Sequence, residues 1–299
     1  MPWIALLTVW IVWGSTYLGI RVAVQTIPPF LMAGTRYLVA GALLYAILFA
    51  TNRTKHGWPT REAWKSLIIR GFALLVVGNG FVSFAEQQLA SSVAALLVAT
   101  VPMFMIVIEA ISAKKKIAGW SIAGLAAGTL GIVMLVGLPG GALPIVPSLL
   151  IIVAALSWAA GSVYARHHAD GEMSPFQPAL EMLIGGAGLL VVGLAAGELR
   201  RFSFGNVSHL SLLGMAWLIG PGAMLGYSAY AYAVRTLPTG IVSTYAYINP
   251  VVAVILGAWL ASEGLTRNVL IGGLAIILSV VAIIAGGRQT RVRESCAAR

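Results

Sequence analysis

The chain has 299 residues, of which 59% are hydrophobic and only 9% carry a charged side chain, and its mean hydropathy is +0.92. A soluble domain has about a quarter of its residues charged, so water could not wet this surface on all sides. The composition therefore excludes an ordinary soluble protein and predicts a protein of the lipid bilayer. The net charge of +10 does not indicate a nucleic-acid partner, because the basic residues are scattered through short predicted loops.

The apolar residues form continuous runs of about 20 residues, which is the length that a transmembrane helix needs. Transmembrane strands would instead alternate polar and apolar residues. Polar residues, prolines and glycines divide the chain into ten predicted spans: residues 3–24, 30–50, 66–86, 91–111, 117–137, 147–165, 176–196, 211–233, 239–261 and 267–286. The sequence thus predicts an all-α integral membrane protein with ten transmembrane helices and short loops.

The basic residues of the predicted loops orient these spans. If the N-terminus is cytoplasmic, fourteen of the nineteen Lys and Arg residues lie on the inner side, Arg200, Arg201 and Arg267 lie on the outer side, and Arg21 and Arg36 lie within spans. The positive-inside rule then places both termini on the cytoplasmic side of an inner (plasma) membrane. The first run lacks a basic leader and a cleavage site, so we expect a retained span rather than a signal peptide.

Few residues indicate catalysis or a metal. The single cysteine, Cys296, excludes a disulfide within the chain, and the four histidines fall in or beside predicted loops without the spacing of a zinc site. The predicted spans contain neither a pairing of His with Asp or Glu nor a Gly-x-Ser-x-Gly motif that would supply a nucleophile. We therefore expect no catalytic residue, no metal and no cofactor, and we expect a small-molecule substrate and the lipid bilayer as partners.

The two halves of the chain repeat a pattern of residues. Trp13 and Arg21 are eight residues apart, and so are Trp158 and Arg166. Further pairs follow in the same order with shifts of 146 to 148: Pro29 and Pro175, Gly78 and Gly226, Pro102 and Pro250, Gly124 and Gly272. We therefore predict two repeats, residues 1–140 and 141–299, with five helices each. Since five is odd, the second repeat enters from the opposite face, which makes the five-helix repeats inverted.

Several of these residues also carry a resemblance to a known family. They are Trp13, Gly14, Arg21, Pro28, Pro29 and Arg36, then the segment 90–104 with Pro102, and then Asn249, Pro250, the segment 262–266 and Gly272. Through these residues, nearly the whole chain resembles the EamA repeats of the drug/metabolite transporter superfamily. The resemblance implies a carrier whose predicted helices 1, 3, 4, 6, 8 and 9 line a central cavity. Within the superfamily the chain is most similar to exporters of amino acids, aromatic ones above all, and of metabolites.

One residue departs from the pattern of that family. The family often places a glutamate before the last helix of each half, and Glu263 has this place in the second half. The shift of 148 puts Lys115 there in the first half. We therefore expect Glu263 to be structural rather than catalytic.

A transporter needs polar or aromatic groups deep in its spans, because unpaired polar groups are costly in hydrocarbon and tend to face a cavity or another helix. Asn79 fits best, since its amide offers two donors and one acceptor between two glycines. The candidate substrate-binding residues are Asn79, Trp13, Trp158, Tyr17, Ser83, Thr100, Tyr227, Tyr230, Tyr245 and Asn249. Trp13 and Trp158 are equivalent in the repeat and could face each other across its axis. Interhelical hydrogen bonding and core packing are the competing interpretations.

Prolines and charges inside the spans are candidates for hinges and gates. Pro102 and Pro250 each free a backbone carbonyl and mark either a hinge or a static kink. The charged candidates are Arg21, Arg36 and Glu86 toward the outer end, where an ion-pair cluster is possible, and Arg166 and Glu181 toward the cytoplasmic end. Snorkelling to the interface is the alternative.

The lack of Asp, Glu and Lys at the centre of any predicted span limits the substrate. An exporter of lipophilic cations normally needs a deep carboxylate, and a phosphate carrier needs deep Lys or Arg. A neutral or zwitterionic solute in a polar but nearly uncharged pocket fits better. We therefore predict a secondary transporter that exports amino acids or related metabolites by alternating access. The alternatives are a drug or nucleotide-sugar carrier, an intramembrane enzyme, a scaffold or a pore.

Overall fold

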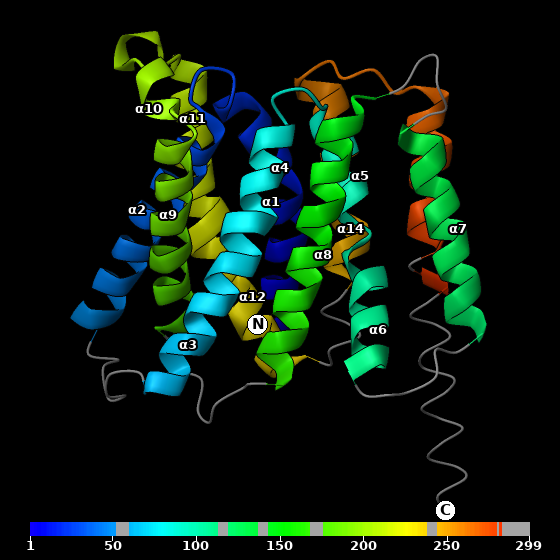
Figure 1. The fold of residues 1–299 in the computed structure, drawn as a ribbon, viewed down its shortest axis with the longest axis horizontal. Coiled ribbons are helices and arrows are strands. Elements are labelled where there is room, and N and C mark those ends of the chain that lie inside the picture. The colour runs from blue at the N-terminus through cyan, green and yellow to red at the C-terminus, as the bar shows by residue number, and fades with distance from the viewer. Residues whose placement is uncertain are drawn as a thin grey trace, which may run out of the picture.

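The structure, a computed structural model, describes residues 1–51, 60–112, 119–136, 143–167, 176–237, 244–279 and 281–282. These residues form helices and no strands, and the long helices stand side by side in one bundle (Figure 1). In chain order the helices are α1 (Pro2–Ala23), α2 (Pro29–Ala50), α3 (Arg61–Arg70), the π-helix η1 (Gly71–Asn79), α4 (Gly80–Ala85), α5 (Ser91–Val98), α6 (Val101–Ser112), α7 (Gly119–Val136), α8 (Ile145–His167), α9 (Gln177–Ala195), α10 (Glu198–Arg201), the 3₁₀ turn η2 (Phe204–Asn206), α11 (His209–Trp217), the π-helix η3 (Leu218–Leu225), α12 (Gly226–Thr236) and α14 (Tyr245–Leu260). A further apolar helix covers Arg267–Ser279.

Seven helices among the described residues are long and apolar enough to cross a bilayer. They cover Pro2–Ala23, Pro29–Ala50, Arg61–Ala85, Ser91–Ser112, Ile145–Ala165, Gln177–Ala195 and His209–Tyr230. Three shorter apolar stretches, Ile122–Gly131, Ile248–Leu260 and Arg267–Ser279, fall where three more spans were predicted. The all-α integral membrane class is confirmed, and the count of ten spans stays a prediction. Four residues named above or in the predicted loops, Cys296, His56, His168 and Lys115, lie outside the described residues, as does the basic tail after Gly287.

Two long spans change their helical pitch in the middle, which the sequence did not predict. The span that begins with α3 passes through η1 into α4, and the span that begins with α11 passes through η3 into α12. Short π-helical segments inside α-helices occur mostly at functional sites, because they rotate the side chains that follow relative to those that precede. Here they come directly before Gly80 and Gly226.

The span Ser91–Ser112 is broken halfway along its length. Its two parts, α5 and α6, meet at Ala99 and Thr100, and the Thr100 hydroxyl donates to the Leu97 carbonyl at 2.7 Å. Pro102 follows directly and lacks the N–H that would continue the helix. Its predicted counterpart, Pro250, instead lies inside the continuous helix α14. The two predicted hinge positions therefore differ, since only the first coincides with a break.

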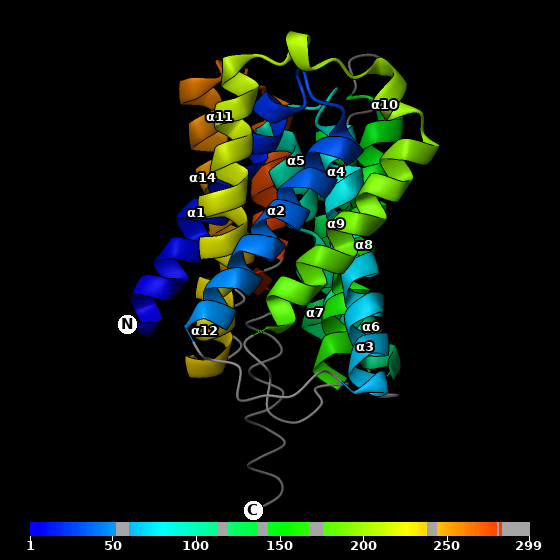
Figure 2. The ribbon, with the colours of Figure 1, turned by 90° about the vertical axis from the view of Figure 1, so that its left-hand side faces the viewer.

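Close helix packing depends on glycines, as is typical in membranes. In the largest contact, between α2 and α9, Gly34 faces Leu190 and Gly186 faces Leu38. A Cβ at Gly186 would lie 2.8 Å from the backbone nitrogen of Leu38, so the two backbones approach too closely for any side chain. This contact appears in Figure 2, where α2 and α9 cross beside each other.

Two carboxylates from the connecting segments cap helix N-termini at the same end of the bundle. Glu198 accepts hydrogen bonds from the backbone N–H groups of Phe30 and Leu31 in the first turn of α2. Glu263 accepts from the N–H and hydroxyl groups of Ser91 and Ser92 at 2.6 to 3.0 Å. A carboxylate stabilises a helix N-terminus through these bonds and through the helix dipole. Glu263 has the structural role that the sequence analysis expected.

Candidate functional site

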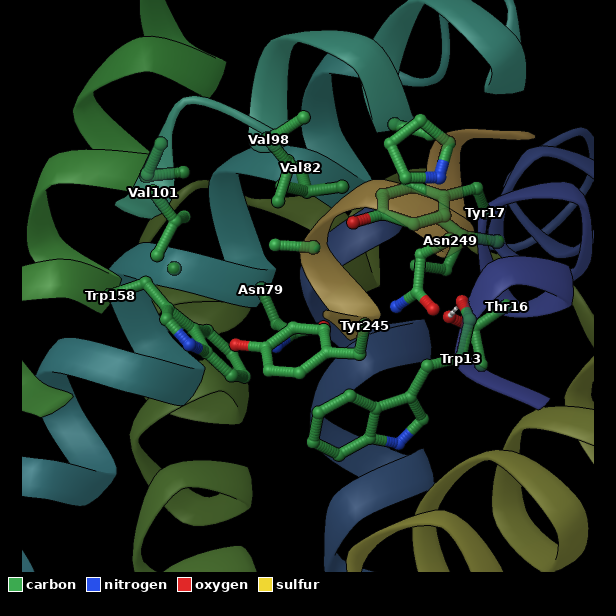
Figure 3. Close-up of a pocket in the computed structure, with 18 of the residues that line it drawn as sticks. Trp13, Thr16, Tyr17, Asn79, Val82, Val98, Val101, Trp158, Tyr245 and Asn249 are labelled. Atoms are coloured by element: carbon green, nitrogen blue, oxygen red, sulfur yellow. Dashed lines mark hydrogen bonds between the residues drawn. The ribbon is translucent and has the colours of Figure 1, made fainter. Parts of the chain in front are cut away.

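The centre of the bundle encloses a cavity (Figure 3). Its volume is about 90 Å³, counted as the space open to the centre of a water molecule. Side chains and backbone from α1, α2, η1, α4, α5, α6, α8, α12 and α14 enclose it: Trp13, Thr16, Tyr17, Ile20, Arg36, Tyr37, Gly78, Asn79, Val82, Ala95, Val98, Ala99, Val101, Ala154, Ala155, Trp158, Tyr227, Tyr245, Ala246, Asn249 and Pro250. Both halves of the sequence therefore contribute to one site.

Trp13 is the centre of an aromatic cluster on one side of this cavity. Its ring centroid lies 5.0 Å from that of Tyr230 and 5.5 Å from those of Tyr227 and Tyr245. The Trp158 ring meets it edge to face, with the centroids 6.5 Å apart and the planes at 87°. Such edge-to-face pairs leave ring faces available for an apolar side chain or a cation.

Two glycines make room for the two tryptophans. A Cβ at Gly226 in α12 would fall on Trp13 Nε1 and would lie 2.7 Å from Trp13 Cδ1. A Cβ at Gly78 in η1 would lie 3.1 Å from Trp158 Cε3. Each tryptophan thus lies against a glycine of a π-containing span. The sequence analysis paired Trp13 with Trp158 and Gly78 with Gly226 by their spacing, but it did not predict that each tryptophan lies against a glycine.

Asn79 carries the amide that is most available to a ligand. Its Nδ2 donates to the Leu74 carbonyl over 3.5 Å, which is at the limit of a hydrogen bond, so most of its capacity is unused among the described residues. Asn249 differs. Oriented with its nitrogen toward α1, its amide donates to the carbonyl oxygens of Trp10 and Tyr245 at 3.1 and 3.2 Å. Asn249 therefore joins two helices, and the competing interpretation of packing applies to it more than to Asn79.

Arg36 lies in the wall of the cavity, although the sequence analysis placed it among the outer gate residues. Its side chain is 3% exposed, and its guanidinium lies 4.6 Å from the centroid of the Tyr37 ring. Its Nε and Nη1 atoms are buried and have no hydrogen-bond partner in the described part of the chain. The cavity therefore holds a fixed positive charge, which corrects the expectation of a nearly uncharged pocket.

Most of the candidate binding residues meet at the cavity, but three do not line it. Trp13, Tyr17, Asn79, Trp158, Tyr227, Tyr245 and Asn249 are in its wall, as are Arg36 and Pro250. Tyr230 belongs to the aromatic cluster behind the wall. Ser83 and Thr100 are fully buried away from the cavity, and Thr100 uses its hydroxyl within its own helix turn.

The predicted outer ion-pair cluster takes another form. Arg21 donates to the carbonyl oxygens of Glu86 and Gln87, where it caps the end of α4, and not to the Glu86 carboxylate. The Glu86 side chain is completely buried, and neither of its oxygens has a hydrogen-bond partner among the described residues. A basic side chain at a helix C-terminus satisfies carbonyls that the helix leaves free.

At the other end of the bundle, Glu181 pairs with Arg70 at 3.0 Å. Arg70 is one of the fourteen basic residues that the sequence analysis counted on the inner side, and the structure buries it in α3 with only 9% of its side chain exposed. The side chain of Arg166, the other residue predicted there, is outside the described part of the structure.

Small residues that sequence reasoning missed create the space of the cavity. Ala95 of α5, Ala99 directly after it, and Ala154 and Ala155 of α8 face it, together with Ala246 of α14. The spacing of four between Ala95 and Ala99 places both on one helix face, and this was the available signal. Tyr37 also lines the cavity and was missed. The sequence indicated it only weakly, as the neighbour of the candidate residue Arg36. The described residues contain no group of three or more His, Cys, Asp or Glu that could hold a metal.

A bundle of apolar helices around a central cavity with aromatic, amide and guanidinium groups defines a multi-pass membrane protein. Comparison with known proteins gives the family. The model of the EamA-like transporter family matches residues 1–137 and 146–285, and the chain belongs to this family.

Named relatives extend over nearly the whole chain. An uncharacterized inner membrane transporter, YedA, of Escherichia coli (strain K12) is 36% identical over 286 residues, which are 94% of this chain and 90% of YedA. Protein PecM of Dickeya dadantii (strain 3937) is 27% identical and covers 91% of this chain and 88% of its own. An uncharacterized transporter, YoaV, of Bacillus subtilis (strain 168) is 24% identical over 93% of this chain and 94% of its own.

A solved crystal structure shares the fold. It superposes on this chain with a TM-score of 0.65 at 16% sequence identity, and the match covers 96% of this chain and 97% of the other. At that identity the likeness shows the arrangement of helices alone.

Proposed function

We propose that the chain is a secondary transporter of an inner membrane that moves amino acids or related small metabolites outward by alternating access. The central cavity carries this proposal, because Arg36, Asn79 and the aromatic cluster around Trp13 meet there. An amino acid presents a carboxylate, an ammonium and a side chain. The guanidinium and the amide can bind the carboxylate, and ring faces can bind the ammonium or an apolar side chain.

The size of the cavity supports a small solute. A volume of about 90 Å³ on this measure has room for roughly six to nine water-sized groups. That is close to the size of a small amino acid, whereas a nucleotide sugar is several times larger and carries phosphates that need more than one positive charge. The names of YedA and YoaV, which are transporters without a stated substrate, agree with transport in general.

Structural pseudo-symmetry supports ten spans in two inverted repeats, residues 1–140 and 141–299, and the basic residues of the predicted loops support cytoplasmic termini. The family model matches twice, over 1–137 and 146–285. The π-helices η1 and η3 occupy equivalent places in the two halves, and each is followed by a glycine. In Figure 1, α1 starts at the lower end of the bundle, whereas α8, its equivalent, starts at the upper end. Inverted repeats of this kind allow a central site to open to either face in turn.

Alternating access also needs elements that can change shape. The break between α5 and α6 lies at the cavity, since Val98, Ala99 and Val101 all line it. Broken helices with backbone at a cavity are typical of transporter sites. We infer that the first half of the chain bends at the break between α5 and α6.

Transport by the purified protein in liposomes tests the proposal. We expect flux of radiolabelled L-threonine and L-phenylalanine, with competition by unlabelled amino acids and none by tetraphenylphosphonium or uridine diphosphate glucose. Asn79→Ala and Trp158→Ala should each reduce flux by about tenfold or more, because each removes a group that contacts the solute. Trp259→Ala is the matched control, since Trp259 is 77% exposed on the outside of α14. No amino-acid flux, or flux unchanged in both cavity variants, would overturn the proposal. Competition by the bulky cation or the nucleotide sugar would favour the broader drug or nucleotide-sugar carrier.

A further inference from the structure

Glu86 is the most unusual charged residue among those described. It follows directly after α4, its side chain is 0% exposed, and both carboxyl oxygens are buried without a hydrogen-bond partner in the described chain. A buried carboxylate in a protein is normally paired or accepts several hydrogen bonds, because an isolated buried charge is very costly. The Glu86 carboxyl group is neither paired nor hydrogen-bonded among the described residues, which indicates a functional rather than a structural role.

The surroundings of Glu86 are charged on several sides. The titratable and charged side chains that act on it are Tyr17 and Arg21 from α1, Arg36 from α2, and Glu263 from the segment after α14. The Glu86 carboxyl group is buried, and the Glu263 carboxylate adds a second negative charge that acts on it, whereas Arg21 and Arg36 act on it as positive charges. In this conformation the neutral carboxylic acid is therefore the favoured form.

Of these neighbours, Arg21 and Glu263 are already engaged. Arg21 binds the carbonyl oxygens at the end of α4, and Glu263 binds the start of α5. Arg36 is different, because its Nε and Nη1 are buried without partners among the described residues and it lines the cavity. A buried carboxyl group and a buried guanidinium thus act on each other, neither is in an ion pair within the described part of the chain, and only the guanidinium faces the cavity.

We propose that Glu86 is a proton-binding site whose occupancy is linked to the binding of a substrate carboxylate at Arg36. When a carboxylate from the cavity binds Arg36, Glu86 holds a proton. When that carboxylate leaves, Arg36 turns to Glu86, the O–H bond of the acid breaks, and the proton passes to water. No other bond changes, and the charge of the pair is balanced in both states. The inference rests on the proposed function for the identity of the solute.

The proposal makes one substrate and one proton travel in the same direction, so that export carries a proton outward as well and is driven by the outward gradient of the solute. Glu86 and the substrate carboxylate compete for the same guanidinium, so binding of one requires neutralisation or departure of the other. It also defines the substrate class: the solute must carry a carboxylate, and the amide or ester of the same amino acid should not replace it. Tyr17 both lines the cavity and interacts with Glu86.

Infrared difference spectroscopy on the purified full chain tests the proton site without any substrate. At about pH 7 the wild type should show the C=O band of a protonated carboxyl that Glu86→Gln lacks. Glu62→Gln, at an exposed glutamate in the first turn of α3, is the matched control and should keep the band. A wild type and a Glu86→Gln variant with the same spectrum would overturn the proposal. Because glutamine has the shape of glutamic acid, an unchanged size-exclusion profile establishes that the variant is folded.

Liposomes that contain a pH-sensitive dye test the linkage. With L-phenylalanine as the probe, the wild type should move about one proton for each molecule, and flux should rise severalfold as the pH falls. Glu86→Gln should move the amino acid with no proton and no pH dependence, and L-phenylalanine amide should give neither flux nor proton movement. Proton movement that survives in Glu86→Gln overturns the proposal and leaves the proposed function intact. A complete lack of amino-acid flux in the wild type overturns the proposed function, and the infrared measurement then decides on the proton site.

Arg36 variants distinguish linkage from a proton site that acts alone. Arg36→Met should keep Glu86 protonated to higher pH than in the wild type, because no guanidinium competes for the proton. Arg36→Lys keeps the charge and should retain a pH response. An infrared band that titrates identically in the wild type and Arg36→Met contradicts the linkage.

Discussion

Trp13 and Trp158 are 145 positions apart in the sequence and meet edge to face, with ring centroids 6.5 Å apart. Each of them lies against a glycine of the opposite π-containing span, Trp13 against Gly226 and Trp158 against Gly78. The first half of the chain therefore supplies the ring and the second half the glycine at one place, and the roles are exchanged at the other. These two reciprocal contacts between a tryptophan and a glycine join the two halves of the chain at the cavity.

This exchange predicts a strong effect of a very small substitution. Gly226→Ala places a methyl group on the indole of Trp13, which is held between three tyrosines and cannot move freely. We expect amino-acid flux in liposomes to fall by about tenfold to a hundredfold, because displacements of an ångström at a site have effects of that size. Gly78→Ala should have a smaller effect, since its Cβ would lie 3.1 Å from Trp158.

Gly220→Ala is the matched control for this measurement. Gly220 belongs to the same π-helix, η3, but a Cβ built there meets nothing within 4 Å. Amino-acid flux through the Gly220→Ala variant should equal that of the wild type. Equal losses in the Gly226 and Gly220 variants would show that the π-helix, and not the contact with Trp13, is sensitive to substitution.

The sequence predicted the relationship between the two tryptophans because it depends on spacing alone. Trp13 with Arg21 and Trp158 with Arg166 repeat the same interval, and equivalent residues of a repeat must lie in related places. The membrane-spanning class followed from composition for a similar reason, since hydrocarbon accepts few charges anywhere along a helix.

Arg36 shows what sequence spacing does not contain. Its position along α2 indicated the outer end of a span, but whether it faces lipid, a neighbour or the cavity depends on the rotation of α2 about its axis. That rotation is set by the contact of α2 with α9, where Gly34 and Gly186 fix the approach of the backbones. The sequence analysis missed the ion pair between Glu181 of α9 and Arg70 of α3 for the same reason. The two residues are far apart in the sequence, and their contact depends on how the two helices pack.

The buried pair of Arg70 and Glu181 should respond asymmetrically to substitution. Glu181→Gln removes one charge and leaves Arg70 buried without its partner, which costs about 3–5 kcal/mol in comparable pairs. The double variant Arg70→Met with Glu181→Leu removes both charges, and we expect it to be more stable than Glu181→Gln alone. Thermal unfolding in detergent, followed by tryptophan fluorescence, measures both. A double variant that is less stable than the single variant would mean that the pair contributes through its attraction rather than through mutual neutralisation.

The Glu263 cap should make the protein sensitive to acid. Burial alone would raise the pKa of this carboxyl, but the hydrogen bonds from Ser92 and Ser91 outweigh it and hold the pKa below its usual value. A carboxyl whose pKa is lower in the folded than in the unfolded state stabilises the fold above its unfolded pKa, and this stability is lost as the pH falls through the folded pKa. Glu263→Gln should therefore lower the unfolding temperature at neutral pH by a few degrees, corresponding to about 1 kcal/mol for a helix cap.

At acidic pH the difference between Glu263→Gln and the wild type should shrink, because the wild type then also lacks the charge. Glu62→Gln serves as the comparison, since Glu62 is exposed in the first turn of α3 and its substitution should leave the unfolding temperature nearly unchanged. A gap between Glu263→Gln and the wild type that is the same at every pH would show that the amide loses a contact unrelated to charge.

Asn249 allows the two interpretations of a polar residue in a span to be separated. Its amide nitrogen donates to the carbonyl oxygens of Trp10 and Tyr245, so its substitution should act on the contact between α1 and α14. Asn249→Ala removes both bonds and should cost about 1–2 kcal/mol of stability. Asn249→Asp is the sharper variant, because it places a carboxylate against two carbonyl oxygens and should be less stable than Asn249→Ala. The order wild type, alanine, aspartate in unfolding temperature is the expected result. An alanine variant with the stability of the wild type and a large loss of flux would instead make Asn249 a ligand for the solute.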